Sequence, residues 1–281
     1  MEIENKVASM NFDAVISSPD ESVDMKSGLD TLQGISDATR KIGETLLTKK
    51  VPQRLHHGSA VRTKLKQSFK GSYGQIFSLE FHDSDLKKEL RKLGRENFVE
   101  LMNYFIGESL YEINSDLSEK SQHHLEKLGN VTEDLIKNLR TSCMENIHEV
   151  PVKFGFDVKL NYRKTRSEKI EIGSFTKETA LVLQAEPTDE EVEIRAAITR
   201  LNINTGNGRL KPEESAETYA FGFSSAYAEI RMEAKKIFSE NLNYNNGIPE
   251  GKWRVIRLRL NPVRLKDRRI IKYIVIGYFN D

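Results

Sequence analysis

The chain has few residues able to build a covalent or metal-bound scaffold. Among its 281 residues there is one Cys, Cys143, and one Trp. A single thiol excludes a disulfide framework and a Cys-rich zinc module, and it fits a reducing compartment. Because Ile136, Leu139, Cys143 and Ile147 share a helical spacing, Cys143 is predicted to lie in a core rather than act as a nucleophile.

Long apolar runs are also missing. No stretch approaches the about 20 apolar residues that span a bilayer, and the first residues are acidic and polar, unlike a signal peptide. The 38% apolar and 8% aromatic content is sufficient for a core, and the length suits one large or two ordinary domains. We therefore expect a soluble, cytoplasmic protein without membrane contact.

Net charge is small, yet it is unevenly distributed. The whole chain carries +1, but residues 1–150 carry −4, residues 151–250 carry −2 and residues 251–281 carry +7. Such an asymmetry favours a polyanionic partner. It is the most informative feature of the sequence.

The first half alternates between strand and helix patterns. Residues 6–16 have the period of two typical of a half-buried strand, and 24–48 have helical spacing. A hairpin is predicted over 60–68 and 75–81. Helices are predicted over about 84–105, 116–128 and 133–147, with Pro151 closing this block. The pattern predicts an N-terminal domain, 1–150, of β-α-β-β followed by three helices.

The second half consists mainly of short strand patterns. Its predicted strands cover 152–162, 168–172, 179–184, 192–203, 218–223, 252–260 and 268–279, with one helix over 225–241. These patterns predict a mostly-β domain, 151–281, built as a small antiparallel β-barrel or sandwich with one helix and a basic terminal hairpin. Residues 161–176 are an alternative connection between the domains. The predicted fold class is α+β.

Three short segments resemble an uncharacterised bacterial domain family. They are the Gly-containing helix from Gly28 to Gly34, the turn Lys70-Gly71-Ser72-Tyr73, and the turn Thr205-Gly206-Asn207-Gly208-Arg209. The resemblance implies a bacterial or mobile-element origin and a two-part architecture. It implies no activity for any residue.

The basic terminal hairpin is the main candidate site. Arg outnumbers Lys in it, and the planar guanidinium suits phosphate oxygens. Trp253 or Tyr273 would add a stacking platform, and the neighbours Val255 and Ile256 indicate a bulge. Pairing with Asp189, Glu190, Glu191 and Glu193 is the competing interpretation. The predicted nucleic-acid-binding residues are Arg254, Arg257, Arg259, Arg264, Lys266, Arg268, Arg269 and Lys272.

Signals for catalysis are weaker. Asp157 and Lys159, with Glu145 and Glu149 upstream, have the acid and Asp-x-Lys order of Mg²⁺-dependent nucleases, although an ordinary strand face has the same pattern. The histidines lack zinc-protease spacing, and His148 suits a helix C-terminus. Gly206-Asn207-Gly208 fits a hairpin turn better than a phosphate loop.

These observations favour binding over catalysis, without a cofactor or metal. The first hypothesis is a nucleic-acid-binding or regulatory protein of a bacterial system. The alternative is a protein-interaction subunit of a multi-gene system such as phage defence, which would use residues 84–147 or the acidic strand. The third is the Mg²⁺-dependent nuclease.

Overall fold

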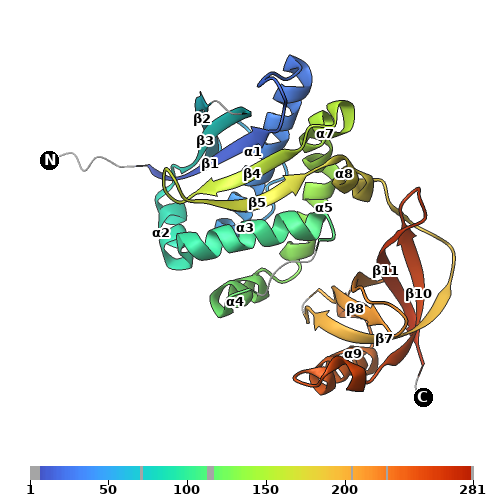
Figure 1. Cartoon of the computed structure of the whole chain (residues 1–281). Coiled ribbons are helices and arrows are strands. Elements are labelled where there is room, and N and C mark those ends of the chain that lie inside the picture. Colours follow the sequence, from blue (N-terminus) through green and yellow to red (C-terminus); the bar gives the residue numbers. More distant parts are fainter. Residues whose placement is uncertain (1–6, 70–71, 113–116, 204, 226, 280–281) are drawn as a thin grey trace. The chain divides into compact units, whose positions relative to one another are not determined.

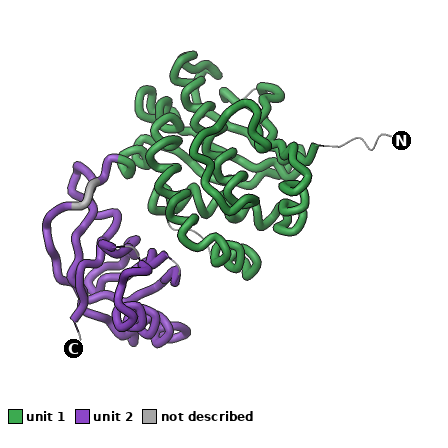
Figure 2. The backbone as a smooth tube through the Cα atoms, turned by 180° about the vertical axis from the view of Figure 1, so that it is seen from behind, with its two compact units in different colours: residues 1–183 green, residues 184–281 purple. Residues whose placement is uncertain are grey.

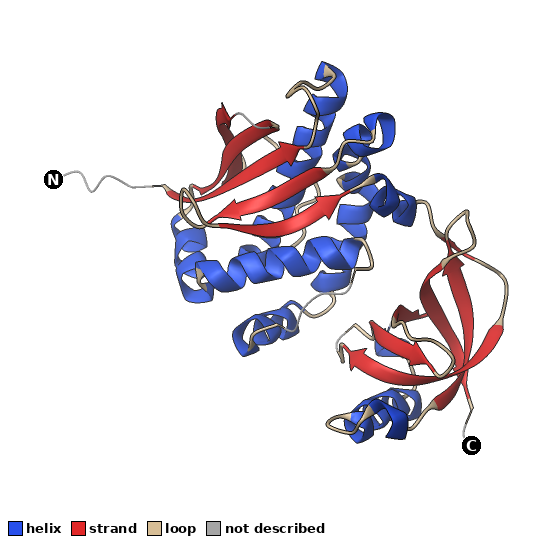
Figure 3. Cartoon of the chain, in the orientation of Figure 1, coloured by secondary structure: helices blue, strands red, loops and turns tan. Residues whose placement is uncertain are grey.

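The computed structural model describes residues 7–69, 72–112, 117–203, 205–225 and 227–279. It contains two compact units, residues 1–183 and 184–281, shown in green and purple in Figure 2. Both combine helices and strands, which confirms the α+β class (Figure 3). Of the turn at 70–73 that carries part of the family resemblance, Lys70 and Gly71 lie outside the described residues.

Unit 1 is built on a five-stranded antiparallel sheet. Its strands are β1 (Ala8–Ile16), β2 (Val61–Phe69), β3 (Tyr73–Phe81), β4 (Val158–Arg163) and β5 (Lys169–Phe175), in the order β2-β3-β1-β4-β5. The predicted strand at 6–16 and the hairpin at 60–81 are confirmed. The alternation of β1 puts one apolar face in the core, where Met10, Phe12, Ala14 and Ile16 are fully buried.

The helices of unit 1 are α1 (Met25–Thr48), α2 (Ser84–Leu93), α3 (Arg95–Ser109), α4 (Glu119–Leu128), α5 (Val131–Ser142), α6 (Met144–Ile147), α7 (Glu149–Phe154) and α8 (Lys177–Leu183) (Figure 1). Helices α1 and α3 contact the sheet, and α4, α5 and α6 pack on these two helices. The Asp24 side chain caps α1 by accepting from the Ser27 backbone N–H at 2.9 Å. Gly34 allows α1 to approach α6, because a Cβ there would lie 2.7 Å from the Ile147 backbone nitrogen.

One predicted helix is broken in two. The apolar stripe of residues 84–105 predicts a single helix, but α2 ends at Leu93 and α3 begins at Arg95. Between them Gly94 has φ +84°, and Asp83 caps α2. A left-handed φ interrupts an α-helix and favours glycine.

One predicted strand begins too early, and another is wrong. Residues 152–154 lie in α7, and the strand begins only at Val158. Pro151 falls in the first turn of α7, where the missing N–H of a proline costs no helix bond, so it does not close the helical block. Residues 177–183 form α8 instead of a strand over 179–184. Alternation over so few residues does not distinguish an exposed short helix from a strand.

The unit boundary follows from strand pairing. β1 pairs with β4 from Phe12–Tyr162 to Ile16–Val158, and β4 pairs with β5. Residues 151–183 therefore complete the sheet of unit 1. The division falls between Leu183 and Gln184 rather than near residue 150.

Unit 2 contains a closed five-stranded barrel. Its strands are β7 (Val192–Leu201), β8 (Gly208–Pro212), β9 (Tyr219–Phe223), β10 (Ile256–Arg264) and β11 (Ile270–Tyr278), in the order β7-β8-β9-β11-β10 and closed by β10 on β7. The short strand β6 (Glu186–Pro187) adds to β10. The predicted barrel with one α-helix is confirmed, except that β9 and β11 are parallel.

The core of the barrel is aromatic and small. Phe221 and Phe238 are fully buried with ring centroids 5.5 Å apart, and Phe238 belongs to α9 (Met232–Asn245), the helix between β9 and β10. The Asn241 side chain of α9 accepts a hydrogen bond from the backbone N–H of Ile198 in β7, at 2.8 Å. The helix thus packs against β7 and supports the barrel.

A buried ionic cluster lies on the opposite face of the unit 1 sheet. Asp13 of β1 has no exposed surface. Its carboxylate accepts from Asn161 at 2.8 Å and Arg163 at 2.6 Å, and lies 2.8 Å from the Lys169 ammonium. The Phe69 ring lies over Gly74 and 4.9 Å from the Lys169 nitrogen. This cluster ties β1, β4 and β5 together.

Candidate nucleic-acid interface

The structure divides the predicted basic hairpin into parts with different surroundings. On the outer face of β10, Arg257 lies 2.7 Å from Glu193 and Arg259 lies 3.7 Å from Glu191, both acids belonging to β7 or the residue before it. At the end of β10, Arg264 donates twice to Glu190, at 3.1 and 2.9 Å. The competing interpretation, pairing with the acidic strand, therefore applies to these three arginines. Exposed pairs of this kind contribute about 0–1 kcal/mol.

Arg254 and the predicted stacking platforms lie apart from the strand face. Arg254 precedes β10, and its guanidinium carbon lies 3.5 Å from the centre of the Tyr244 ring. Tyr273 is buried in the barrel core, so its proposed stacking role is wrong. Trp253 is half-buried and donates to the Ile248 carbonyl at 2.8 Å. The predicted bulge at Val255 and Ile256 is also absent from the described pairing, because β10 begins at Ile256 and its bulges lie at 259/260 and 263/264.

The turn between β10 and β11 presents exposed cations. Leu265 donates to the Arg269 carbonyl at 2.9 Å, which closes the turn, and Arg268 has φ +69°. Arg269 pairs with Asp267 at 2.7 Å. Hydrogen bonds from the backbone and side chain of Arg269 lower the pKa of Asp267 below its usual range. Lys266 and Arg268 are exposed, and within the described residues neither forms an ion pair.

A row of cations crosses the outer face of β7, β8, β9 and β11. Arg200 of β7 is opposite Arg209 of β8, Arg209 is opposite Ala220 of β9, and Ala220 is opposite Lys272 of β11. Residues that are opposite in register point to the same face of a sheet. Strands lie about 4.8 Å apart, so the row spans roughly 14 Å. We call Arg200, Arg209, Ala220 and Lys272 the cation row.

Of this row the sequence predicted only Lys272. Arg200 and Arg209 were missed as a pair because they lie outside the basic C-terminal segment. The sequence feature that could have predicted this pair is its position. Both residues flank the turn at 205–208, which brings them opposite each other. The inner faces of the same strands carry Leu210, Phe221 and Tyr273, which fixes the row on the outside.

Small residues lie at the centre of the row. β9 contributes Ala220 and Gly222 to the outer face, and a Cβ on Gly222 would lie 2.7 Å from Asn207 Oδ1 and 3.2 Å from Lys272 Nζ. The Asn207 and Lys272 side chains therefore meet over Gly222. Arg209 is held in place by donating to Thr218 Oγ1 at 3.1 Å and to the Thr218 carbonyl at 2.8 Å.

The loop between β7 and β8 borders the same face. Gly206 has φ +75°, and a Cβ there would lie 2.3 Å from the Tyr227 ring. Tyr227 thus packs directly on this loop, and burial raises its pKa. The Lys235 ammonium lies 4.8 Å from the centre of the same ring. The loop is fixed from within by Asn202, whose carbonyl accepts from the Gly206 N–H at 2.8 Å.

The nuclease constellation is not assembled. Lys159 lies 2.8 Å from Glu171, and Glu149 pairs with Lys153. Within the described residues, no three His, Cys, Asp or Glu side chains are grouped to hold a metal ion. Cys143 is buried in the core as predicted, and burial raises its pKa. His148 is also buried, and burial lowers its pKa.

No family model, curated protein or solved structure matches this chain. The described helices include none that is both long and apolar enough to cross a membrane. In unit 2, strands 1-2-3-5-4 close a barrel in which strands 3 and 5 are parallel and a helix joins strands 3 and 4. These connections make a five-stranded Greek-key barrel.

Proposed function

We propose that unit 2 binds single-stranded nucleic acid across the outer face of β8 and β9, and that the chain is a binding or regulatory protein rather than an enzyme. The cation row carries this proposal, because it lies on the second and third strands of the barrel and their neighbours. Barrels of this topology bind oligonucleotides on that face and with the loops after strands 1 and 4. We keep the expectation that the protein is cytoplasmic and bacterial.

The side chains of the face suit a phosphate backbone. Arg200, Arg209 and Lys272 supply positive charge across the row, and Arg268 and Lys266 extend it at the turn after the fourth strand. Each phosphate neutralised releases a counterion, which favours binding at low salt. The Asn207 and Lys272 side chains meet over Gly222, so an amide and an ammonium would face the approaching strand. Fold alone does not define function, so the charge pattern is the stronger support.

Arg257 and Arg259 have no role in this proposal. Arg257 is ion-paired with Glu193 of β7, and Arg259 with Glu191, which precedes β7. The hypothesis of polyanion binding is thus retained, while its site moves from the outer face of β10 to the face of β8, β9 and β11. This difference provides a matched pair of variants.

We expect the variant R200Q/R268Q/K272Q to bind a fluorescent oligothymidine of about 12 nucleotides much more weakly than the wild type. Each phosphate contact removed weakens binding by about tenfold at low salt, and it reduces the slope of log K against log salt by about 0.7. Fluorescence anisotropy at several salt concentrations measures both. Arg209 is left intact because it supports the end of β9.

The control is R254Q/R257Q/R259Q, which removes the same charge from β10 and the residues before it. We expect it to keep wild-type affinity within about threefold, since its arginines lie on β10 or before it and not on the proposed face of β8, β9 and β11. If both triple variants lost the same affinity for oligothymidine, net charge alone would explain the effect, and the proposed site would be refuted. An absence of wild-type binding at low salt would refute the function.

A further inference from the structure

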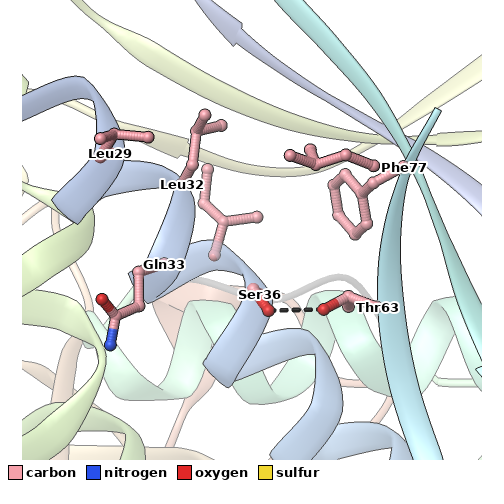
Figure 4. A pocket seen from close by; sticks show the side chains of 8 residues that line it. Leu29, Leu32, Gln33, Ser36, Thr63 and Phe77 are labelled. Carbon is pink, nitrogen blue, oxygen red and sulfur yellow. Dashed lines mark hydrogen bonds between the residues drawn. The ribbon is translucent and has the colours of Figure 1, made fainter. Parts of the chain in front are cut away.

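A groove opens between helix α1 and strand β2 in unit 1. Its cavity of about 330 Å³ lies between Leu29 and Leu32 of α1, Leu65 of β2 and Phe77 of β3. Figure 4 shows Leu29 and Leu32 on one side of the open space and Phe77 on the other, with Ser36 and Thr63 joined by a hydrogen bond. That bond, 2.6 Å long, closes the groove where helix and strand are nearest.

The groove leaves apolar surface uncovered. Leu65 is 64% exposed and Leu29 is 58% exposed, and both line the groove. Leu65 is opposite Phe77 in register and so faces the helix layer, but α1 does not cover it. Met25, at the first turn of α1, is 78% exposed. Contiguous apolar side chains of this kind are typical of a binding surface.

Strand β2 is also the edge of the sheet. It has β3 as its neighbour on one side, and in the described part of the chain no strand lies on the other. The outer edge of such a strand presents backbone donors and acceptors to an incoming extended chain. A peptide added there would direct every second side chain into the groove beside Leu65.

The other face of β2 indicates the charge of the occupant. Arg62, Lys64 and Lys66 alternate with the groove-facing Thr63 and Leu65. Arg62 is held by donating to the Ser59 carbonyl at 2.8 Å, and Lys66 lies 3.2 Å from Glu80. A second copy of β2 would bring like charges together across the strands, which is destabilising, whereas acidic side chains would be attracted.

We propose that the α1–β2 groove binds an extended segment of a partner protein, in which apolar residues alternate with Asp or Glu. The segment adds as a strand beside β2. Its apolar side chains fill the space between Leu29, Leu32 and Leu65, and its carboxylates face Lys64 and Lys66. This site is independent of nucleic-acid binding by unit 2.

The test uses a fluorescent peptide of alternating Asp and Leu, compared with a peptide of the same composition in which the leucines are grouped. We expect the full chain to bind the alternating peptide more tightly by at least about tenfold. L65E should bind the alternating peptide at least about tenfold more weakly, because the new carboxylate would lie against the leucines of the bound peptide. K64E should lose several-fold through repulsion of the peptide's carboxylates. Leu65 is exposed, so its replacement leaves folding intact.

The matched control is M232E, which puts the same charge on an exposed apolar residue of unit 2 and should bind the peptide like the wild type. Equal affinity for the two peptides, or unchanged affinity in L65E, would overturn the proposal. A dimer that depends on Leu65, seen by light scattering, would overturn it in favour of a second copy. Oligothymidine binding by L65E should equal that of the wild type, so the two sites fail or succeed separately.

Discussion

Replacing Asp13 with Ala is expected to lower the free energy of unfolding of unit 1 by about 3–5 kcal/mol. The carboxylate is fully buried and is the shared partner of Asn161, Arg163 and Lys169. Its removal leaves a guanidinium of which only 14% is exposed without its anion. A partly buried cation without a partner costs more than the pair contributes. Denaturant unfolding followed by far-ultraviolet circular dichroism measures the loss.

The D85A variant is the control for this loss. Asp85 pairs with Lys88 at 3.0 Å, but both side chains are more than half exposed, so its loss should be negligible. Trp253, the one tryptophan of the chain, lies in unit 2, and its fluorescence transition should be unchanged in D13A. Equal stability of D13A and D85A would show that the ionic cluster does not hold the sheet together.

Replacing Phe221 with Ala is expected to destabilise unit 2 by about 3–5 kcal/mol. Phe221 is fully buried, and its ring lies 5.5 Å from that of Phe238 and against Gly208. The alanine leaves a cavity in a small barrel, and a unit of this size has a total stability of only about 5–15 kcal/mol. The transition of Trp253 fluorescence in denaturant reports this change directly.

F221L provides the comparison, because it keeps most of the apolar volume and should cost clearly less than F221A. The circular dichroism transition of unit 1 should be unaffected in both variants, since the units have separate cores. A loss below about 1 kcal/mol in F221A would contradict the packing described for the barrel.

The sequence was sufficient to predict most of the elements of the fold but not all of their partners. Alternation in β1 and helical spacing in α1 are local signals, and both elements are where they were predicted. The place of β4 beside β1 depends on pairing across more than a hundred residues, so the unit boundary was misplaced. The short helices α7 and α8 were missed because one or two turns show too little periodicity.

The candidate site shows the same division between local and long-range information. The concentration of charge in residues 251–281 was visible in the sequence, and the acidic strand was recognised as its possible partner. Which arginines it neutralises depends on the register of β10 with β7, which puts Arg257 near Glu193. The cation row draws on four strands, and the neighbour order β7-β8-β9-β11 brings Arg200 and Lys272 to one face.

The most direct test of the central claim is to locate bound oligonucleotide on the full chain. Oligothymidine containing a photoreactive 4-thiothymidine is cross-linked at low salt, and the attached peptides are identified by mass spectrometry. The proposed face predicts cross-links in residues 208–223 and in the turn at 265–272. Cross-links confined to unit 1 or to the strand face of Arg257 and Arg259, or none at all, would contradict it.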